Sequence, residues 1–229
     1  VCILTMQFNI MLRHNLEHEM EIITQMWMKD QEQYRISSDT IDQINRKCHD
    51  MRHQIRSIGS SAKVDANALK EMEQAIHIYD SMFQTGSRAL DVILTEKSMA
   101  CQECGITVNC IADGSALSFM EDSDIYSLFG NLLENSINAV KALDASLRTI
   151  DLSIRRHDEL LSISTRNFYE GTITMENGRP VTSGDPRYHG FGTKSVAAIV
   201  SKYGGAVSFR AQSGTFSVNM LFPLKKKEA

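Results

Sequence analysis

The sequence predicts an α+β protein in which a long N-terminal helical hairpin precedes an α/β sandwich with a mixed sheet. The uneven placement of helix-breaking residues and a change in apolar spacing both lead to this prediction. Only two of the 13 glycines, Gly59 and Gly86, lie before residue 100, and the first of the three prolines is Pro180. Because Gly and Pro interrupt regular structure, residues 1–99 should form a helical domain and residues 100–229 a looped α/β domain.

Length, charge and cysteine content exclude several classes of protein. A chain of 229 residues is long enough to bury a core without disulfides. The net charge of −4 argues against a protein that binds nucleic-acid phosphates. The five cysteines are an odd number, which disfavours a secreted disulfide framework. The apolar residues 1–12 could be either the end of a transmembrane helix or the start of a packed soluble helix.

The first helix carries a heptad repeat, which is typical of a coiled-coil seam. Residues seven apart are Met20, Trp27, Tyr34, Ile41, Cys48 and Ile55. The companion positions hold Leu16, Ile23, Ser37, Ile44, Met51 and Ile58, and Asp30 interrupts the series. A second helical pattern follows the Gly59 break, with Leu69, Met72, Ile76, Tyr79, Phe83, Leu90 and Ile93. One hairpin cannot bury both stripes, so we expect two chains to pair in a four-helix bundle, as a homodimer.

The second domain alternates between strand and helix patterns. Strands are expected at 106–112, 150–155, 160–165, 206–210 and 216–222. Helices are expected at 124–143 and 194–203. Helices interleaved with paired strands predict a layered sandwich around one mixed sheet.

Three asparagines share one stripe of the helix predicted at 124–143. Asn131, Asn135 and Asn138 follow the spacing i, i+4, i+7, opposite an apolar face that includes Leu132 and Val140. Asparagine is a poor residue for a helix interior, so three on one stripe indicate a function. Their amide oxygens, with the neighbouring Glu134, suit a hard cation bound to phosphate oxygens.

Two further segments carry candidate chemistry. Residues 189–195, HGFGTKS, place Gly190 and Gly192 at the start of a helix, where backbone N–H groups can approach a phosphate. In residues 47–55, KCHDMRHQI, a carboxylate follows His49 directly and can orient its imidazole for nucleophilic attack, although a charged surface face is the alternative interpretation. The pair Cys101 and Cys104 lacks a second pair, so free thiols are expected there.

Together these segments resemble the GHKL superfamily of ATPases, and within it sensor histidine kinases of the peptide-sensing Firmicutes type. The asparagine helix resembles their N box, HGFGTKS their second glycine box, KCHDMRHQI their phosphoacceptor motif, and residues 79–97 their second bundle helix. The resemblance spans residues 40–224. It implies a dimerisation and phosphoacceptor domain at 1–99 and an ATP-binding catalytic domain at 100–229.

The resemblance also implies an activity and the residues that perform it. The γ-phosphoryl group of ATP would pass to His49 and then to an aspartate on the receiver domain of a response regulator. Asp50 and Glu134 would assist catalysis, and Asn135 would bind Mg²⁺. The nucleotide would be held by Asn131, Asn138, Asn167, His189, Gly190, Gly192, Thr193 and Lys194. Such kinases usually form the cytoplasmic part of a bacterial membrane protein, whose N-terminal sensor region would be missing here.

One motif of the superfamily is absent. Many GHKL kinases carry a D-x-G-x-G box whose aspartate accepts a hydrogen bond from the adenine amino group, whereas this chain has Asn167 after the third predicted strand. An amide oxygen can also accept, but without charge assistance, so weaker nucleotide binding is expected.

A glycine- and proline-rich loop at 169–188 has the composition of a lid.

Two alternatives remain open at the level of sequence. One is an ATP-independent histidine phosphotransferase or scaffold of the same architecture, suggested by the missing aspartate. The other is a coiled-coil interaction protein with a purely structural sandwich, which the three aligned asparagines disfavour.

Overall fold

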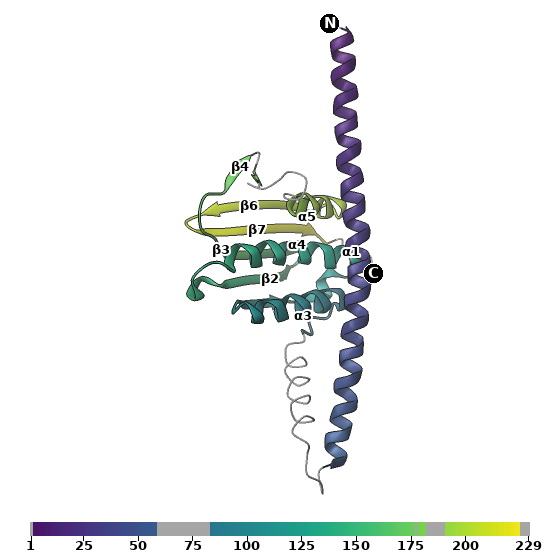
Figure 1. Cartoon of the computed structure of the whole chain (residues 1–229), viewed down its shortest axis with the longest axis vertical. Coiled ribbons are helices and arrows are strands. Elements are labelled where there is room, and N and C mark those ends of the chain that lie inside the picture. Colours follow the sequence, from purple (N-terminus) through teal and green to yellow (C-terminus); the bar gives the residue numbers. More distant parts are fainter. Residues whose placement is uncertain (1, 59–82, 177, 182–190, 225–229) are drawn as a thin grey trace.

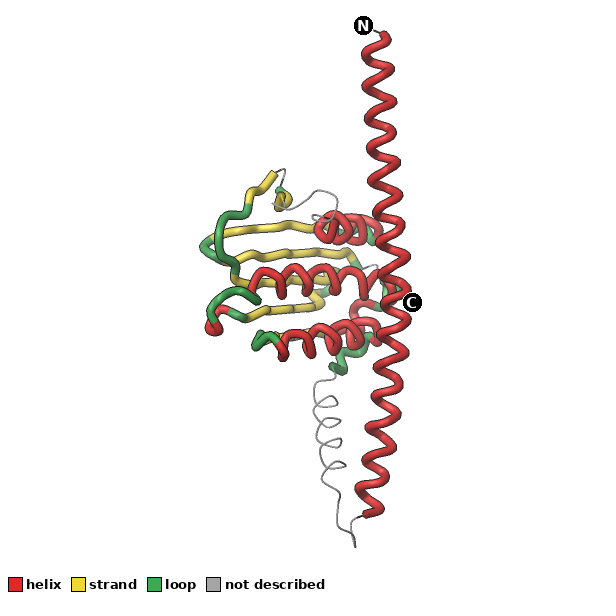
Figure 2. Tube along the Cα trace, in the orientation of Figure 1, coloured by secondary structure: helices red, strands yellow, loops and turns green. Residues whose placement is uncertain are grey.

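A single long helix runs past the side of a compact sandwich of helices and strands (Figure 1). The computed structural model describes residues 2–58, 83–176, 178–181 and 191–224. Helix α1 (Cys2–Ile58) is 57 residues long and runs across the ends of the shorter helices. Figure 2 shows the helices of the sandwich on one face of its sheet. The predicted α+β class and the mixed sheet are confirmed.

The main sheet has five strands in the order β1-β2-β3-β7-β6. Strands β1 and β2 are parallel, and every other neighbouring pair is antiparallel. Each predicted strand overlaps an observed one: β1 (Thr107–Ala112), β2 (Thr149–His157), β3 (Leu160–Phe168), β6 (Ala206–Gln212) and β7 (Thr215–Pro223). Burial alternates along β2 and β3, so one face of the sheet packs on the core and the other meets solvent.

Three helices cover the buried face: α3 (Arg88–Glu103), α4 (Asp122–Val140) and α5 (Phe191–Lys202). Short 3₁₀ helices, η1 (Gly114–Leu117) and η2 (Ala145–Leu147), connect them to the strands. The apolar stripe predicted on α4 is buried, with Leu132, Leu133, Ile137 and Val140 all in the core. The largest fully buried side chains include Phe129 from α4 and Phe222 from β7, so the core lies between the helices and the sheet.

The predicted second helix of the hairpin is wrong at its C-terminal end. Residues 83–87 are not helical, and Gly86 has a φ of +93°, a conformation that glycine adopts without strain. A new helix, α3, then starts behind Ser87, whose side chain accepts a hydrogen bond from the Leu90 backbone N–H. Leu90 and Ile93, which matched the second helical pattern, are therefore residues of the sandwich core. Residues 59–82 lie outside the described residues.

The predicted boundary between domains 1–99 and 100–229 falls inside α3. Residues on both sides of that boundary, from Ala89 to Cys101, are buried in the same core. Among the described residues, the sandwich therefore begins near Arg88, and the two-domain division with its boundary at residue 99 stays a prediction.

The predicted lid contains a small hairpin where the sequence indicated only a loop. Strands β4 (Thr174–Glu176) and β5 (Arg179–Val181) pair antiparallel and form a separate two-stranded sheet. Met175 packs against the main core, which holds one side of this hairpin on the sandwich. The rest of the predicted lid, 182–188, lies outside the described residues.

Helices α4 and α5 are joined at one end by a buried carboxylate. Asp124, in the first turn of α4, is 1% exposed and accepts hydrogen bonds from Lys202 Nζ at 2.6 Å and Tyr203 Oη at 2.5 Å. Tyr203 Oη also accepts from the backbone N–H of Glu121, at 2.9 Å. A carboxylate near a helix N-terminus is favoured by the helix dipole, so Asp124 stabilises its own helix and holds it against α5. The hydrogen bonds of Asp124 to Lys202 and Tyr203 form a clamp between the two helices.

We predict that Asp124→Asn lowers the free energy of unfolding by about 1–3 kcal/mol, because a charged hydrogen-bond acceptor with two donors is lost. Chemical denaturation measures the change. Glu121→Gln is the matched control, since Glu121 contacts the same Lys202 from an exposed position and its substitution should cost less than about 0.5 kcal/mol. Equal losses in the two variants would contradict a clamp centred on Asp124.

Candidate functional site

The site is centred on the place where the start of α5 meets the middle of α4. A Cβ atom built on Gly192 would lie 3.0 Å from Asn131 Oδ1 and 3.3 Å from Asn135 Nδ2. Any side chain larger than hydrogen would therefore push these two amides apart. The structure thus brings together two of the three predicted asparagines and the second predicted glycine.

This meeting follows from antiparallel packing of the two helices. The contact between Asp124 and Lys202 joins the start of α4 to the end of α5. From Asp124, Asn131 and Asn135 lie about 10 and 16 Å further along α4, and from Lys202, Gly192 lies about 15 Å back along α5, at 1.5 Å per residue. The clamp and the site are therefore the two ends of one helix pair.

Asn131 is held with its oxygen toward α5. Its Nδ2 donates to the Ser127 backbone carbonyl at 2.8 Å, so its carbonyl oxygen is the atom nearest Gly192. Asn138 differs, because it donates to Glu134 at 3.2 Å and accepts from Lys141 Nζ at 2.6 Å. The third asparagine therefore takes part in a surface network of its own helix, and its predicted nucleotide contact stays a prediction.

Glu134 bonds to α3, through a residue that sequence analysis did not single out. Its Oε2 accepts from Lys97 Nζ at 2.8 Å. The hydrogen bond from Lys97 lowers the pKa of the Glu134 carboxyl below its usual value. The carboxylate is therefore ionised at neutral pH. No sequence motif marked Lys97, because its partner lies 37 residues away on another helix.

The residues at Gly192 fit a phosphate ligand and a hard cation. The oxygens of Asn131 and Asn135 both lie within 4 Å of the space above Gly192, which a Cβ would fill. Amide oxygens are suitable ligands for Mg²⁺, and the N–H groups at the start of α5 favour an anion. These residues could hold a Mg²⁺-nucleotide, with Asn135 as the metal ligand and the α5 start against the phosphates.

A cleft of about 390 Å³ adjoins these residues, between α1, α3 and α4. Asn131 and Glu134 line its α4 wall, and Lys29 and Gln33 line its α1 wall. The remaining lining residues are Ile93, Glu96, Lys97, Tyr126, Ser127 and Gly130. Helix α1 therefore contributes to the surroundings of the candidate site, which sequence analysis did not predict.

Asn167 is buried near the end of β3, on the face that the helices cover. It is 4% exposed, and its Nδ2 donates to the Phe168 backbone carbonyl at 2.8 Å. The side-chain oxygen remains as the acceptor that adenine recognition requires. In the ladder it lies opposite Ile150 and Phe216.

The structure describes the other predicted site residues only in part. His49 and Asp50 belong to α1, but their side chains lie outside the description, as do His189 and Gly190 altogether. Thr193 and Lys194 lie in the first turn of α5, beside Gly192. Their predicted phosphate contacts stay predictions.

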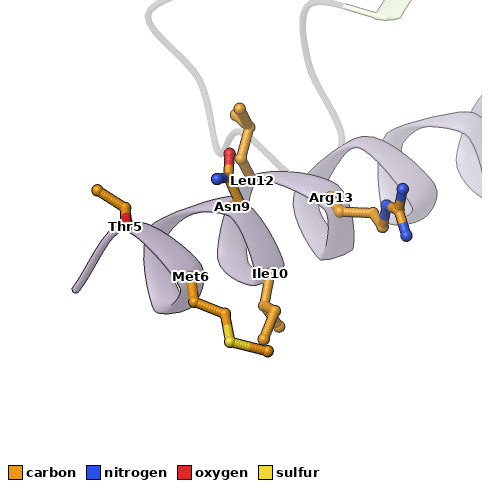
Figure 3. Close-up of a pocket in the computed structure, with 6 residues that line it drawn as sticks. All are labelled: Thr5, Met6, Asn9, Ile10, Leu12 and Arg13. Atoms are coloured by element: carbon orange, nitrogen blue, oxygen red, sulfur yellow. The ribbon is translucent and has the colours of Figure 1, made fainter. Parts of the chain in front are cut away.

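Several other features of the described residues are separate from this site. Burial raises the pKa of both Cys101 and Cys110 to about 11, so these thiols are protonated at neutral pH. Over the described part of the chain, no group of three His, Cys, Asp or Glu residues is arranged to hold a metal ion. A hollow near the N-terminal end of α1 is lined by six residues of that one helix, including Asn9 and Arg13 (Figure 3). None of the helices described in the structure is both long and apolar enough to cross a membrane.

Comparison with known proteins shows what this sandwich is similar to. Residues 120–223 match the GHKL domain. A probable C4-dicarboxylate sensor kinase of Bacillus subtilis (strain 168) is 27% identical over 153 residues, covering 60% of this chain but 27% of the length of that kinase. Among solved structures, the catalytic domain of histidine kinase ThkA covers 61% of this chain and 93% of its own at 13% identity, with a TM-score of 0.45. Acinetobacter baumannii histidine kinase AdeS covers 82% of this chain and 98% of its own at 11% identity, with a TM-score of 0.44.

The part of the chain that matches the GHKL domain holds α4, α5 and the strands from β2 to β7. The chain is homologous to a sensor kinase in the part that aligns with the Bacillus subtilis protein. The resemblance found in the asparagine and glycine segments is confirmed at this level, and the narrower peptide-sensing branch stays a prediction.

We predict that Lys97→Met raises the pKa of Glu134 toward its usual value, because the main hydrogen-bond donor to the carboxylate is removed. The ion pair between Lys97 and Glu134 stabilises the fold at pH values above the usual carboxyl pKa. This stabilisation is lost as the pH falls through the lowered pKa of Glu134. A carbon-13 NMR titration of the Glu134 carboxyl measures the pKa. Lys141→Met is the control and should raise it less, since Lys141 bonds to Asn138 instead. A larger rise with Lys141→Met would contradict the assignment.

Proposed function

We propose that this chain is the kinase portion of a two-component sensor histidine kinase. It would transfer the γ-phosphoryl group of ATP to His49 and then to an aspartate on the receiver domain of a response regulator. The observation that carries this proposal is the convergence of Asn131 and Asn135 on Gly192 within a GHKL domain. The homology to a sensor kinase supports the same activity.

Phosphoryl transfer depends mainly on positioning and charge stabilisation, so the roles are distributed over the site. Asn135 is the proposed Mg²⁺ ligand, and Asn131 orients the phosphates with the N–H groups of Gly192, Thr193 and their neighbours. Lys194 adds positive charge at the same helix start. Asn167 is the proposed acceptor for the adenine amino group, from its buried place on β3.

The transfer step itself joins a nitrogen of the His49 imidazole to the γ-phosphorus while the bond from that phosphorus to the bridging oxygen of ADP breaks. Asp50 follows His49 directly and would hold the imidazole in the reactive tautomer. Glu134, whose pKa is lowered by the hydrogen bond from Lys97, is ionised and would orient groups at the edge of the site rather than donate a proton.

The proposed kinase acts as a homodimer, and its parent protein is anchored in a bacterial membrane by a sensor region outside this chain. In the first thirty residues of α1, Phe8, Met11, Met20 and Met28 are each more than half exposed. Such a run of apolar side chains on one helix is suited to a second copy, since large apolar surfaces rarely face water.

We predict that Asn135→Ala weakens Mg²⁺-dependent ATP binding by at least about tenfold, because a metal ligand is lost. Isothermal titration calorimetry measures the affinity, and circular dichroism checks the fold. Asn219→Ala is the matched control, because Asn219 lies in β7 on the open face of the sheet and away from α4. Unchanged binding in Asn135→Ala would show that the metal site is misplaced. An unmodified chain that binds no ATP would favour the ATP-independent phosphotransferase.

We predict that γ-labelled ATP gives an acid-labile, alkali-stable label, as a phosphoramidate does, and that His49→Gln abolishes it. His53 lies one turn further along the helix without a carboxylate directly after it, so His53→Gln should only reduce the label. Autoradiography after alkaline treatment measures the label. Label that persists in His49→Gln and vanishes in His53→Gln would move the phosphoacceptor by one turn.

A further inference from the structure

A chain of hydrogen bonds links four polar side chains of α3 and α4 beside the candidate site. Lys97 Nζ, from α3, donates to Glu134 Oε2 at 2.8 Å, and Asn138 Nδ2 donates to Glu134 Oε1 at 3.2 Å. Lys141 Nζ donates to Asn138 Oδ1 at 2.6 Å. Glu134 is the carboxylate of this group, and Lys97 is the cation that bonds to it directly.

Glu134 lies beside the two asparagines that converge on Gly192. It directly precedes Asn135 in α4 and follows Asn131 by three residues, which places it about 1.5 Å and 4.5 Å from them along the helix axis. Residues three apart are neighbours on a helix surface, and Glu134 and Asn131 line the same cleft. A carboxylate is therefore placed at the border of the proposed phosphate site.

A negative charge at this border opposes the proposed ligand. The phosphates of ATP carry several negative charges, and a single Mg²⁺ neutralises only part of them. Like charges several ångströms apart repel each other measurably near a protein surface. A carboxylate in this position therefore weakens nucleotide binding unless a cation compensates its charge.

Lys97 is held where it provides this compensation. Its side chain is 20% exposed, whereas that of Glu134 is 53% exposed. The neighbouring residues Ile93 and Leu94 of α3 are buried in the core, which fixes the backbone that carries Lys97. Ion pairs with exposed members contribute little to the stability of a fold. A gain in stability therefore gives a weak reason for a lysine held largely out of water at this position.

The second carboxylate near Lys97 is satisfied by another residue. Glu96 Oε1 lies 3.9 Å from Lys97 Nζ, but Glu96 Oε2 accepts a hydrogen bond from Tyr126 Oη at 2.6 Å. The shorter contact, with Glu134, is therefore the one that decides which charge Lys97 compensates.

We propose that Lys97 is a positioning residue for the nucleotide, which neutralises Glu134 and holds that carboxylate on the α3 side of the phosphate site. Lys97 acts through Glu134 rather than on a phosphate directly. The inference rests on the proposed function, because it requires nucleotide phosphates at Asn131, Asn135 and the start of α5. It adds that the effect of Lys97 grows with the number of charged phosphates.

Nucleotide binding in the presence of Mg²⁺, measured by isothermal titration calorimetry, tests the proposal. We expect Lys97→Met to weaken ATP binding about three- to tenfold, because an uncompensated carboxylate then repels the phosphates. The loss should be smaller for ADP and smallest for AMP. It should also shrink as the ionic strength rises from about 0.01 M to about 0.15 M, since the screening length falls from about 30 Å to about 8 Å.

Three further variants distinguish charge compensation from a structural role. Lys97→Met/Glu134→Gln removes both charges and should restore ATP affinity to within about twofold of that of the unmodified chain. Glu134→Gln alone leaves a free cation and should tighten ATP binding, whereas a structural ion pair would give losses in both single variants. Lys97→Arg keeps the charge and should retain the affinity within about twofold. Circular dichroism checks that each variant is folded.

A second ion pair of the same length serves as the control. Arg166 and Asp151 also approach to 2.8 Å, and they lie on the open face of the sheet, away from α4. Arg166→Met and Asp151→Asn make the same changes in charge as the variants of Lys97 and Glu134. Each should alter ATP affinity by less than about 1.5-fold.

The outcomes separate a failure of this inference from a failure of the proposed function. The inference is overturned if Lys97→Met binds ATP unchanged, loses AMP and ATP equally, or does not recover when Glu134→Gln is added. A loss in Arg166→Met as large as that in Lys97→Met would also overturn it. Each of these results leaves the kinase function intact. An unmodified chain that binds neither ATP nor ADP would overturn the proposed function, and the inference with it.

Discussion

The antiparallel packing of α5 on α4 is the constraint on which the candidate site depends. A buried carboxylate at one end, Asp124, binds Lys202, the last residue of α5, and Tyr203, which follows it. At the other end a glycine allows the start of α5 to approach two asparagines of α4. Each end limits the other, because a slip of one turn at the clamp would carry Gly192 away from Asn131 and Asn135. The two helices therefore pack together at both of these points above the sheet.

The sheet supports this unit through a single apolar interface. Alternate residues of β2 and β3, with Met220 and Phe222 of β7, contact the buried faces of the helices. Asn167 lies in this otherwise apolar layer, where a buried polar side chain needs a partner, and it bonds to the neighbouring backbone carbonyl. Burying a polar side chain costs free energy, so its presence in the core suits the specific recognition of adenine that is proposed for Asn167.

Helix α1 contacts the sandwich of its own chain through polar side chains. Tyr34 and Ser37 of α1 bond to Asp122 and Glu96 of the sandwich, and Arg88 pairs with Asp42, so this contact is polar and partly charged. Among the described side chains of α1 before residue 30, Phe8, Met11, Met20 and Met28 are exposed and are suited to a second copy. One helix thus carries two kinds of surface, one polar and in contact with the sandwich and one apolar and exposed.

Local sequence patterns determined most of the elements. Alternation predicted all five strands of the main sheet, and apolar spacing predicted α4 and α5, because these elements bury one face against a core. The amide stripe of α4 and the glycines Gly190 and Gly192 at the start of α5 marked the candidate site, since residues of these types are costly in a helix without a reason.

Tertiary structure decided the features that depend on residues far apart in the sequence. Helical spacing continued from Phe83 to Ile93, but the turn at Gly86 and the burial of α3 in the sandwich ended the hairpin there. Lys97 and Asp124 carry no motif, because their roles arise only when another helix brings Glu134 or Lys202 beside them. Likewise, heptad spacing shows that Tyr34, Ser37 and Ile41 face a partner. Only packing determines whether that partner is a second chain or the sandwich of the same chain, since both would bury the same stripe.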